Sequence, residues 1–105
     1  PIQVVIVPIW KTDEERAATI ETARRIADDL GSFKRPDHER IRVHVDDRVG
    51  IKPGNKYYHW ETRGIPLRLE IGPRDLASQS GMLVRRDTRE KRPIAFDRLK
   101  PELPE

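Results

Sequence analysis

A stretch of aromatic and charged residues, GNKYYHWETRGIPLRLEIGPRD at positions 54–75, holds the side chains best suited to binding chemistry. On a helix, Tyr57 and Trp60 are neighbours because they are three residues apart, and Glu61 lies one turn beyond Tyr57. An aromatic ring can stack on an unstacked RNA base while nearby charged groups hydrogen-bond to the edge of that base. This helix therefore has the residue types needed to read single-stranded RNA.

The strand expected at 65–71 adds further charge. Arg68 and Glu70 alternate with three apolar residues, so the charged pair shares one face of the strand and the apolar residues share the other. Arg74 and Asp75 follow the strand, at the sheet edge where α/β proteins usually bind ligands. An arginine can donate to the acceptor edge of guanine, and a carboxylate can accept from its donor edge.

Each of these features also has a purely structural interpretation. Trp60 can belong to the core, with both neighbouring tyrosines half-buried. The pairs Arg68–Glu70 and Arg74–Asp75 can be surface ion pairs, which contribute little to stability. The residue pattern alone leaves both interpretations open.

Residues for catalysis or for metal binding are sparse. The three histidines lie in different predicted elements and lack the spacing of a metal-ligand pair, so we interpret them as surface or satisfied side chains. Asp46 and Asp47 can hold a cation or form a solvated strand end beside Arg48. The absence of cysteine excludes disulfides and thiolate–zinc sites. We expect no catalytic residue and no metal site in this chain.

Size and composition predict one domain of 105 residues with a single modest core. The net charge of +3 permits a nucleic-acid partner without requiring one. No apolar run is long enough to span a membrane, and we expect no membrane partner. The expected location is the cytoplasm. We also expect both ends of the sequence to be cuts in a longer polypeptide.

The elements around the charged strand are predicted from periodicity and turn residues. The β-branched run at 2–7 predicts a strand buried on both faces. Thr12 and Glu15 form a capping-box signature for a helix over 13–30, which Gly31 would end. The polar segment 31–40 is expected to be a loop. The remaining predictions are a strand at 41–45, a helix at 56–63 stopped by Gly64, a helical turn at 75–78, strands at 82–86 and 92–96, and a helix start at 97–99.

The order of these elements favours an α/β fold. Helices after the first and second strands require parallel, right-handed crossovers. The short link between the last two strands implies an antiparallel pair. The sequence therefore predicts a mixed sheet with helices on its faces.

Several segments also resemble a known family. IQVVIVPI, VDDR, PGNKYYHWE and above all GIPLRLEIGPRDL are similar to the anticodon-binding domain of prolyl-tRNA synthetase, of the archaeal and eukaryotic-like type of that class II enzyme. The resemblance covers residues 1–99. It implies a three-layer α/β/α anticodon-binding domain with a five-stranded mixed sheet, one strand antiparallel. Residues 100–105 would then start a connection to a missing C-terminal module.

The resemblance also implies roles for five residues. By position, Tyr57 matches an aromatic residue that stacks on an anticodon base, and Glu61 matches a carboxylate that contacts a base. Arg68, Arg74 and Asp75 match the remaining base-reading positions. The implied function is recognition of the two guanines that all proline anticodons share.

The partners implied by the resemblance are proline tRNA, bound at its anticodon loop, and a catalytic domain of the same chain. Nothing here resembles the class II catalytic core, so this chain alone should not aminoacylate and needs no cofactor. The parent enzyme would be a proline–tRNA ligase that uses ATP and Mg and forms a homodimer. The alternative is a tRNA-sensing or accessory protein that reuses the fold without ligase activity. A stand-alone enzyme of flavodoxin-like shape lacks a catalytic constellation, and the contribution of the loop 31–40 stays open.

Overall fold

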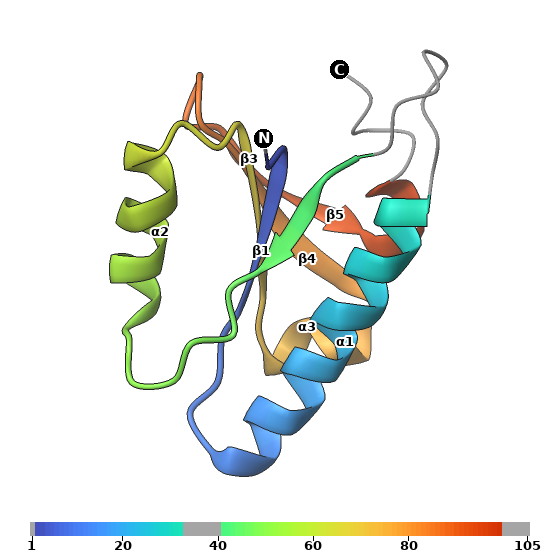
Figure 1. The fold of residues 1–105 in the computed structure, drawn as a ribbon. Coiled ribbons are helices and arrows are strands. Elements are labelled where there is room, and N and C mark those ends of the chain that lie inside the picture. Colours follow the sequence, from blue (N-terminus) through green and yellow to red (C-terminus); the bar gives the residue numbers. More distant parts are fainter. Residues whose placement is uncertain (1, 33–40, 100–105) are drawn as a thin grey trace.

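The computed structural model describes residues 2–32 and 41–99, which form a sheet of five strands in the order β2-β1-β3-β4-β5 (Figure 1). The strands are β1 (Val4–Pro8), β2 (Val43–Val45), β3 (Leu67–Ile71), β4 (Ser80–Arg85) and β5 (Lys91–Ala95). β1 pairs in parallel with β2 and with β3, whereas β4 runs antiparallel to β3 and to β5. β4 is thus the antiparallel strand of the mixed sheet, which confirms the prediction.

Helices cover both faces of this sheet (Figure 1). α1 (Asp13–Ser32) packs on β1 and β2, and the short α3 (Pro73–Ser78) packs against α1. α2 (Pro53–Thr62) lies on the other side of the sheet and contacts β1. A 3₁₀ turn, η1 (Phe96–Arg98), follows β5 where the sequence predicted a helix start. The arrangement is the expected three-layer α/β/α domain.

The start of α1 is the capping box that the sequence predicts. The Thr12 Oγ1 atom accepts a hydrogen bond of 3.1 Å from the backbone N–H of Glu15. The Glu15 carboxylate in turn accepts from the backbone N–H of Thr12 at 3.4 Å. These two bonds satisfy donors that have no partner within the helix.

The predicted end of α1 at Leu30 is wrong. The helix continues through Gly31 to Ser32, and Gly31 does not adopt the positive φ of a glycine that ends a helix. Burial of Leu30 keeps the last turn packed on the core. The Ser32 hydroxyl also donates to the carbonyl of Asp29 at 2.8 Å. Residues 33–40 of the predicted loop and the predicted connection at 100–105 lie outside the described residues.

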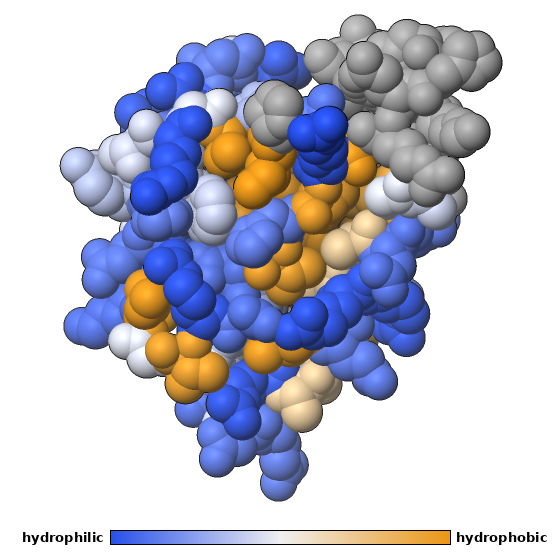
Figure 2. Space-filling model, viewed as in Figure 1, coloured by the Kyte–Doolittle hydropathy of each residue, from blue (hydrophilic) through white to orange (hydrophobic). Residues whose placement is uncertain are grey.

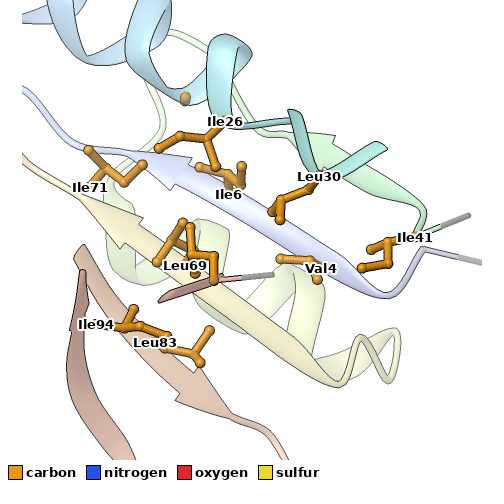
Figure 3. Close-up of a cluster of buried hydrophobic side chains, with 11 residues drawn as sticks. Val4, Ile6, Ile26, Leu30, Ile41, Leu69, Ile71, Leu83 and Ile94 are labelled. Atoms are coloured by element: carbon orange, nitrogen blue, oxygen red, sulfur yellow. The ribbon is translucent and has the colours of Figure 1, made fainter. Parts of the chain in front are cut away.

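The main core lies between the sheet and α1 (Figure 3). β3 contributes Leu69 and Ile71 to it, as the alternation in the strand predicts, and Val43 and Val45 of β2 pack against it. Burying one such aliphatic side chain stabilises the fold by about 1.5–3 kcal/mol. The cluster consists of Val4, Ile6, Ala23, Ile26, Leu30, Ile41, Leu69, Ile71, Leu83, Ile94 and Leu99.

The surface is mostly hydrophilic in the view of Figure 2, with apolar side chains gathered over the strands between α1 and α2. No helix in the described part of the chain is both long and apolar enough to cross a membrane.

α2 begins earlier than the sequence predicts. Lys52 is extended, with φ −67° and ψ 147°, and Pro53 occupies the first turn, where its missing N–H costs no hydrogen bond. The helix ends at Thr62, and Gly64 turns the chain into β3 with a φ of +77°, a conformation that favours glycine. This turn fixes the position of α2 over the charged face of β3.

Candidate nucleic-acid interface

Arg68 is the centre of a charged group on the face of the sheet that α2 covers. Its Nη1 donates to Glu61 Oε2 at 2.8 Å, and its Nε donates to Glu70 Oε2 at 3.0 Å. The other oxygen of Glu70 pairs with Lys91 Nζ at 3.0 Å. Together with Tyr57, these residues are called the Arg68 cluster below. The structure thus brings Glu61 on α2 and Arg68 on β3 into direct contact.

Tyr57 completes the cluster through its ring. The Arg68 Cζ atom lies 4.1 Å from the ring centroid, a cation–π contact. Burial, followed by the negative charge of Glu70, raises the pKa of the Tyr57 phenol, so the hydroxyl stays protonated at neutral pH. The cation–π contact means that Arg68 covers part of the Tyr57 ring. The next residue, Tyr58, is 71% exposed.

The surroundings of Arg68 hold its guanidinium in one place. The side chain is only 12% exposed, and Glu70 is 8% exposed, whereas the Glu61 side chain is 36% exposed and so partly accessible. The guanidinium has more N–H donors than its two carboxylate bonds use, so it can also donate to a ligand. A planar donor that is already fixed loses little conformational freedom on binding.

Arg74 and Asp75 lie elsewhere, in α3 beyond the C-terminal end of β3. Asp75 Oδ2 accepts from the backbone N–H of Gly72 at 2.7 Å and so caps its own helix. Arg74 is exposed, and among the described residues it forms no ion pair with Asp75. The predicted site is therefore divided between the Arg68 cluster and the strand end.

The interpretation of Asp46 as a solvated strand end is wrong. The residue is 1% exposed, and its carboxylate accepts from Arg48 Nε at 2.8 Å, Arg48 Nη2 at 2.7 Å and Trp60 Nε1 at 2.7 Å. Burial alone would raise the pKa of Asp46, but the hydrogen bonds from Arg48 and Trp60 hold it well below its usual range. The buried charge is stable because its oxygens have donors.

A buried lysine extends this network. Lys56 is 2% exposed, its Nζ donates to the backbone carbonyl of Asp46 at 3.1 Å, and it lies 4.8 Å from the centroid of the Trp10 ring. Burial lowers the pKa of this lysine. Trp60 is only half-buried and also contacts the His44 and His59 rings. The interpretation of Trp60 as a core residue with half-buried tyrosines is wrong, because the indole lies outside the core cluster and Tyr58 is exposed. The indole instead anchors α2 to the end of β2 through its hydrogen bond to Asp46.

No group of three or more metal-ligating side chains that could hold an ion occurs among residues 2–32 and 41–99. Sequence reasoning missed the Asp46–Lys56–Trp60 network and the exposure of Tyr58. One signal was available for Tyr58: adjacent residues on a helix point to different sides, so Tyr57 and Tyr58 cannot share one environment.

Comparison with known protein families identifies the type of domain. The chain matches the model for "Anticodon binding domain" over residues 3–105. This chain belongs to the anticodon-binding domain family.

The relatives of this anticodon-binding domain include three proline–tRNA ligases. That of Thermococcus kodakarensis is 50% identical over 103 residues, which are 98% of this chain and 20% of the relative. The ligase of Chloroflexus aggregans is 47% identical over 87 residues, 83% of this chain and 17% of the relative. That of Pyrobaculum arsenaticum is 44% identical over 99 residues, 94% of this chain and 19% of the relative.

The chain therefore spans about one fifth of the length of the curated relatives that it matches. The resemblance drawn from the sequence motifs is confirmed.

Proposed function

We propose that this anticodon-binding domain recognises the anticodon loop of proline tRNA as part of a proline–tRNA ligase. The observation that carries the proposal is the Arg68 cluster, in which Tyr57, Glu61 and Arg68 meet on one face of the sheet. The family match over residues 3–105 and the names of the relatives support it.

The cluster has the chemistry to read one guanine. Guanine has acceptors at O6 and N7, which suit the guanidinium of Arg68, and N–H donors on its pairing edge, which suit the carboxylate of Glu61. Each such paired contact discriminates against a wrong base by about 1–3 kcal/mol. The accessible part of the Tyr57 ring would stack on the same base, as aromatic side chains do in single-stranded RNA recognition.

A second guanine would be read at the strand end by Arg74 and Asp75. Arg74 is exposed, and one carboxylate oxygen of Asp75 is used by the Gly72 N–H while the other remains as an acceptor. Arg74 would donate to the acceptors of this guanine, and Asp75 would accept from its N–H donors, as proposed for Arg68 and Glu61. The Arg68 cluster and the pair of Arg74 and Asp75 lie at different places along β3, which supports the binding of one base by each group.

For the whole protein we propose ligation of proline to its tRNA by a catalytic domain of the same chain. ATP and Mg would bind that catalytic domain, and the intact enzyme would be a cytoplasmic homodimer. The role of this domain would be to hold the tRNA by its anticodon loop, so that only proline tRNA is presented for the reaction.

Binding of this chain to a hairpin with the proline anticodon tests the proposal. The control is the same hairpin with adenine in place of both guanines, and fluorescence anisotropy gives both affinities at one salt concentration. We expect clear preference for the guanine hairpin. Equal binding to the two hairpins would overturn the proposal.

A further inference from the structure

A basic pocket lies beside the Arg68 cluster, between the C-terminal end of α2 and the turn that joins β4 to β5. Figure 1 shows this turn next to the end of α2. The pocket has a volume of about 220 Å³. Five of its lining side chains are cationic, Arg68, Arg85, Arg86, Arg89 and Lys91, and one lining residue, Glu61, is a carboxylate.

Three of these cations are already paired. Arg68 binds Glu61 and Glu70, and Lys91 also binds Glu70. Arg85 forms two hydrogen bonds with Asp87, at 3.1 and 3.2 Å. The carboxylates at the pocket are thereby neutralised.

Arg86 and Arg89 are the two pocket cations that pair with no carboxylate among the described residues. Arg86 Nε donates to the backbone carbonyl of Glu61 at 2.9 Å, which is a neutral acceptor and leaves the rest of the guanidinium available. Within the described residues, Arg89 has no hydrogen bond or ion pair from its side chain. The neighbouring Glu90 is exposed and does not line the pocket. An excess of positive charge therefore faces the pocket.

The backbone of Arg89 gives an independent indication. Its φ is +60°, in the left-handed region, where glycine and asparagine are favoured and other residues are strained. Such positions in hairpin turns are normally occupied by glycine. A residue other than glycine at such a position is expected where its side chain has a function that offsets the backbone strain.

We infer that this pocket binds a phosphate group of the RNA backbone, with Arg86 and Arg89 as its ligands. The inference rests on the proposed function, because Glu61 and Arg68 line the pocket and also face the base that they are proposed to read. A base read there has its own phosphate close by in the chain. Arginine suits this ligand because its planar fork can donate two parallel hydrogen bonds to phosphate oxygens.

The role of such a contact differs from that of base reading. Phosphate contacts fix the position and orientation of the nucleic acid but carry no sequence information. They also release counterions, so the logarithm of the affinity falls with the logarithm of the salt concentration in proportion to the number of contacts. Arg86 and Arg89 thus position the anticodon loop while Glu61 and Arg68 discriminate its bases.

The test is the salt dependence of binding to the proline-anticodon hairpin, with Arg89→Gln as the variant. Affinity at low salt is expected to fall several-fold, and the slope of log affinity against log salt to decrease by about 0.7–1. Preference for guanine over adenine should be unchanged. Arg89→Lys, which keeps the charge, should retain most of the slope.

Two further variants make the result specific. Arg25→Gln removes an exposed cation from α1, on the opposite side of the sheet, and should leave both affinity and slope unchanged. Arg89→Gly suits the positive φ, so it should fold at least as well as the parent chain and still lose the salt-dependent contact.

The outcomes for the pocket and for base reading are separable. Guanine preference with an unchanged slope in Arg89→Gln would overturn the phosphate site but not the proposed function, and would leave an acidic protein segment as the occupant. A reduced slope without guanine preference would support the phosphate contact and overturn base reading. Absence of RNA binding by the parent chain would overturn both.

Discussion

The Arg68 guanidinium lies 4.1 Å from the centroid of the Tyr57 ring while its Nη1 donates to Glu61 Oε2 at 2.8 Å. One side chain thus connects the aromatic ring of α2 with the carboxylate one turn further along the same helix. The geometry exists before any RNA is bound, so little side-chain freedom remains to be lost on binding. A ligand that uses one of these three groups must therefore affect the other two.

Arg68→Lys tests whether the fork of the guanidinium matters in addition to its charge. Lysine cannot donate two parallel hydrogen bonds and stacks less well on an aromatic ring. We expect discrimination between guanine and adenine hairpins to fall by about 1–3 kcal/mol, the value of one paired base contact. Thermal unfolding of the variant provides the control, because a variant that has lost its fold would weaken binding to every RNA.

Arg74→Ala tests the second group of predicted base-reading residues. The side chain is exposed, so we expect little change in stability and a loss of guanine discrimination of about 1–3 kcal/mol. Binding to hairpins with each guanine replaced in turn measures it. A loss of equal size on every hairpin would mean that Arg74 contacts phosphate and not a base.

Trp60→Phe tests the anchor between α2 and β2. The change keeps most of the apolar surface but removes the donor of the 2.7 Å hydrogen bond to Asp46. Leaving the buried carboxylate short of one donor should reduce the free energy of unfolding by about 1–3 kcal/mol. Trp60→Ala also removes the packing of the half-buried indole and should cost more than Trp60→Phe. Urea denaturation measures both, and unchanged stability in both would contradict the anchoring role.

The buried Asp46 predicts a dependence of stability on acid pH. Its folded pKa lies well below the unfolded value of about 3.9, so the unfolded chain binds the proton more readily. The stabilisation is therefore present above the unfolded pKa and is lost as the pH falls toward the folded pKa. Unfolding free energies from pH 6 to pH 2 should fall less steeply in Asp46→Asn than in the parent chain. Parallel curves would contradict the contribution of this carboxylate.

The alternation within β3 was sufficient to predict the two faces of that strand. Leu69 and Ile71 lie in the core, and Arg68 and Glu70 face α2, because successive side chains of a strand point to opposite sides. The antiparallel pairing of β4 and β5 followed from their short connection. These features depend on local pattern and chain connectivity, which a sequence contains directly.

Other features depend on contacts between distant residues. Asp46 looked like a solvated strand end because nothing adjacent to it in sequence buries it; Trp60, fourteen residues later, does. Gly31 looked like a helix end, but packing of Leu30 on the core outweighs its preference. The pocket that contains Arg89 is formed by a turn and a helix end that are far apart in the sequence.

The most direct test of guanine recognition by this domain combines Glu61→Ala with removal of the guanine amino group. Inosine lacks the exocyclic amine of guanine, so replacing each guanine of the hairpin in turn removes one donor that Glu61 is proposed to bind. In the parent chain one of the two replacements should weaken binding clearly, and in Glu61→Ala, which has no acceptor for the amine, the same replacement should have much less effect. If the losses of binding free energy from the protein substitution and from the inosine replacement simply add at both guanine positions, the claim that Glu61 reads a guanine is contradicted.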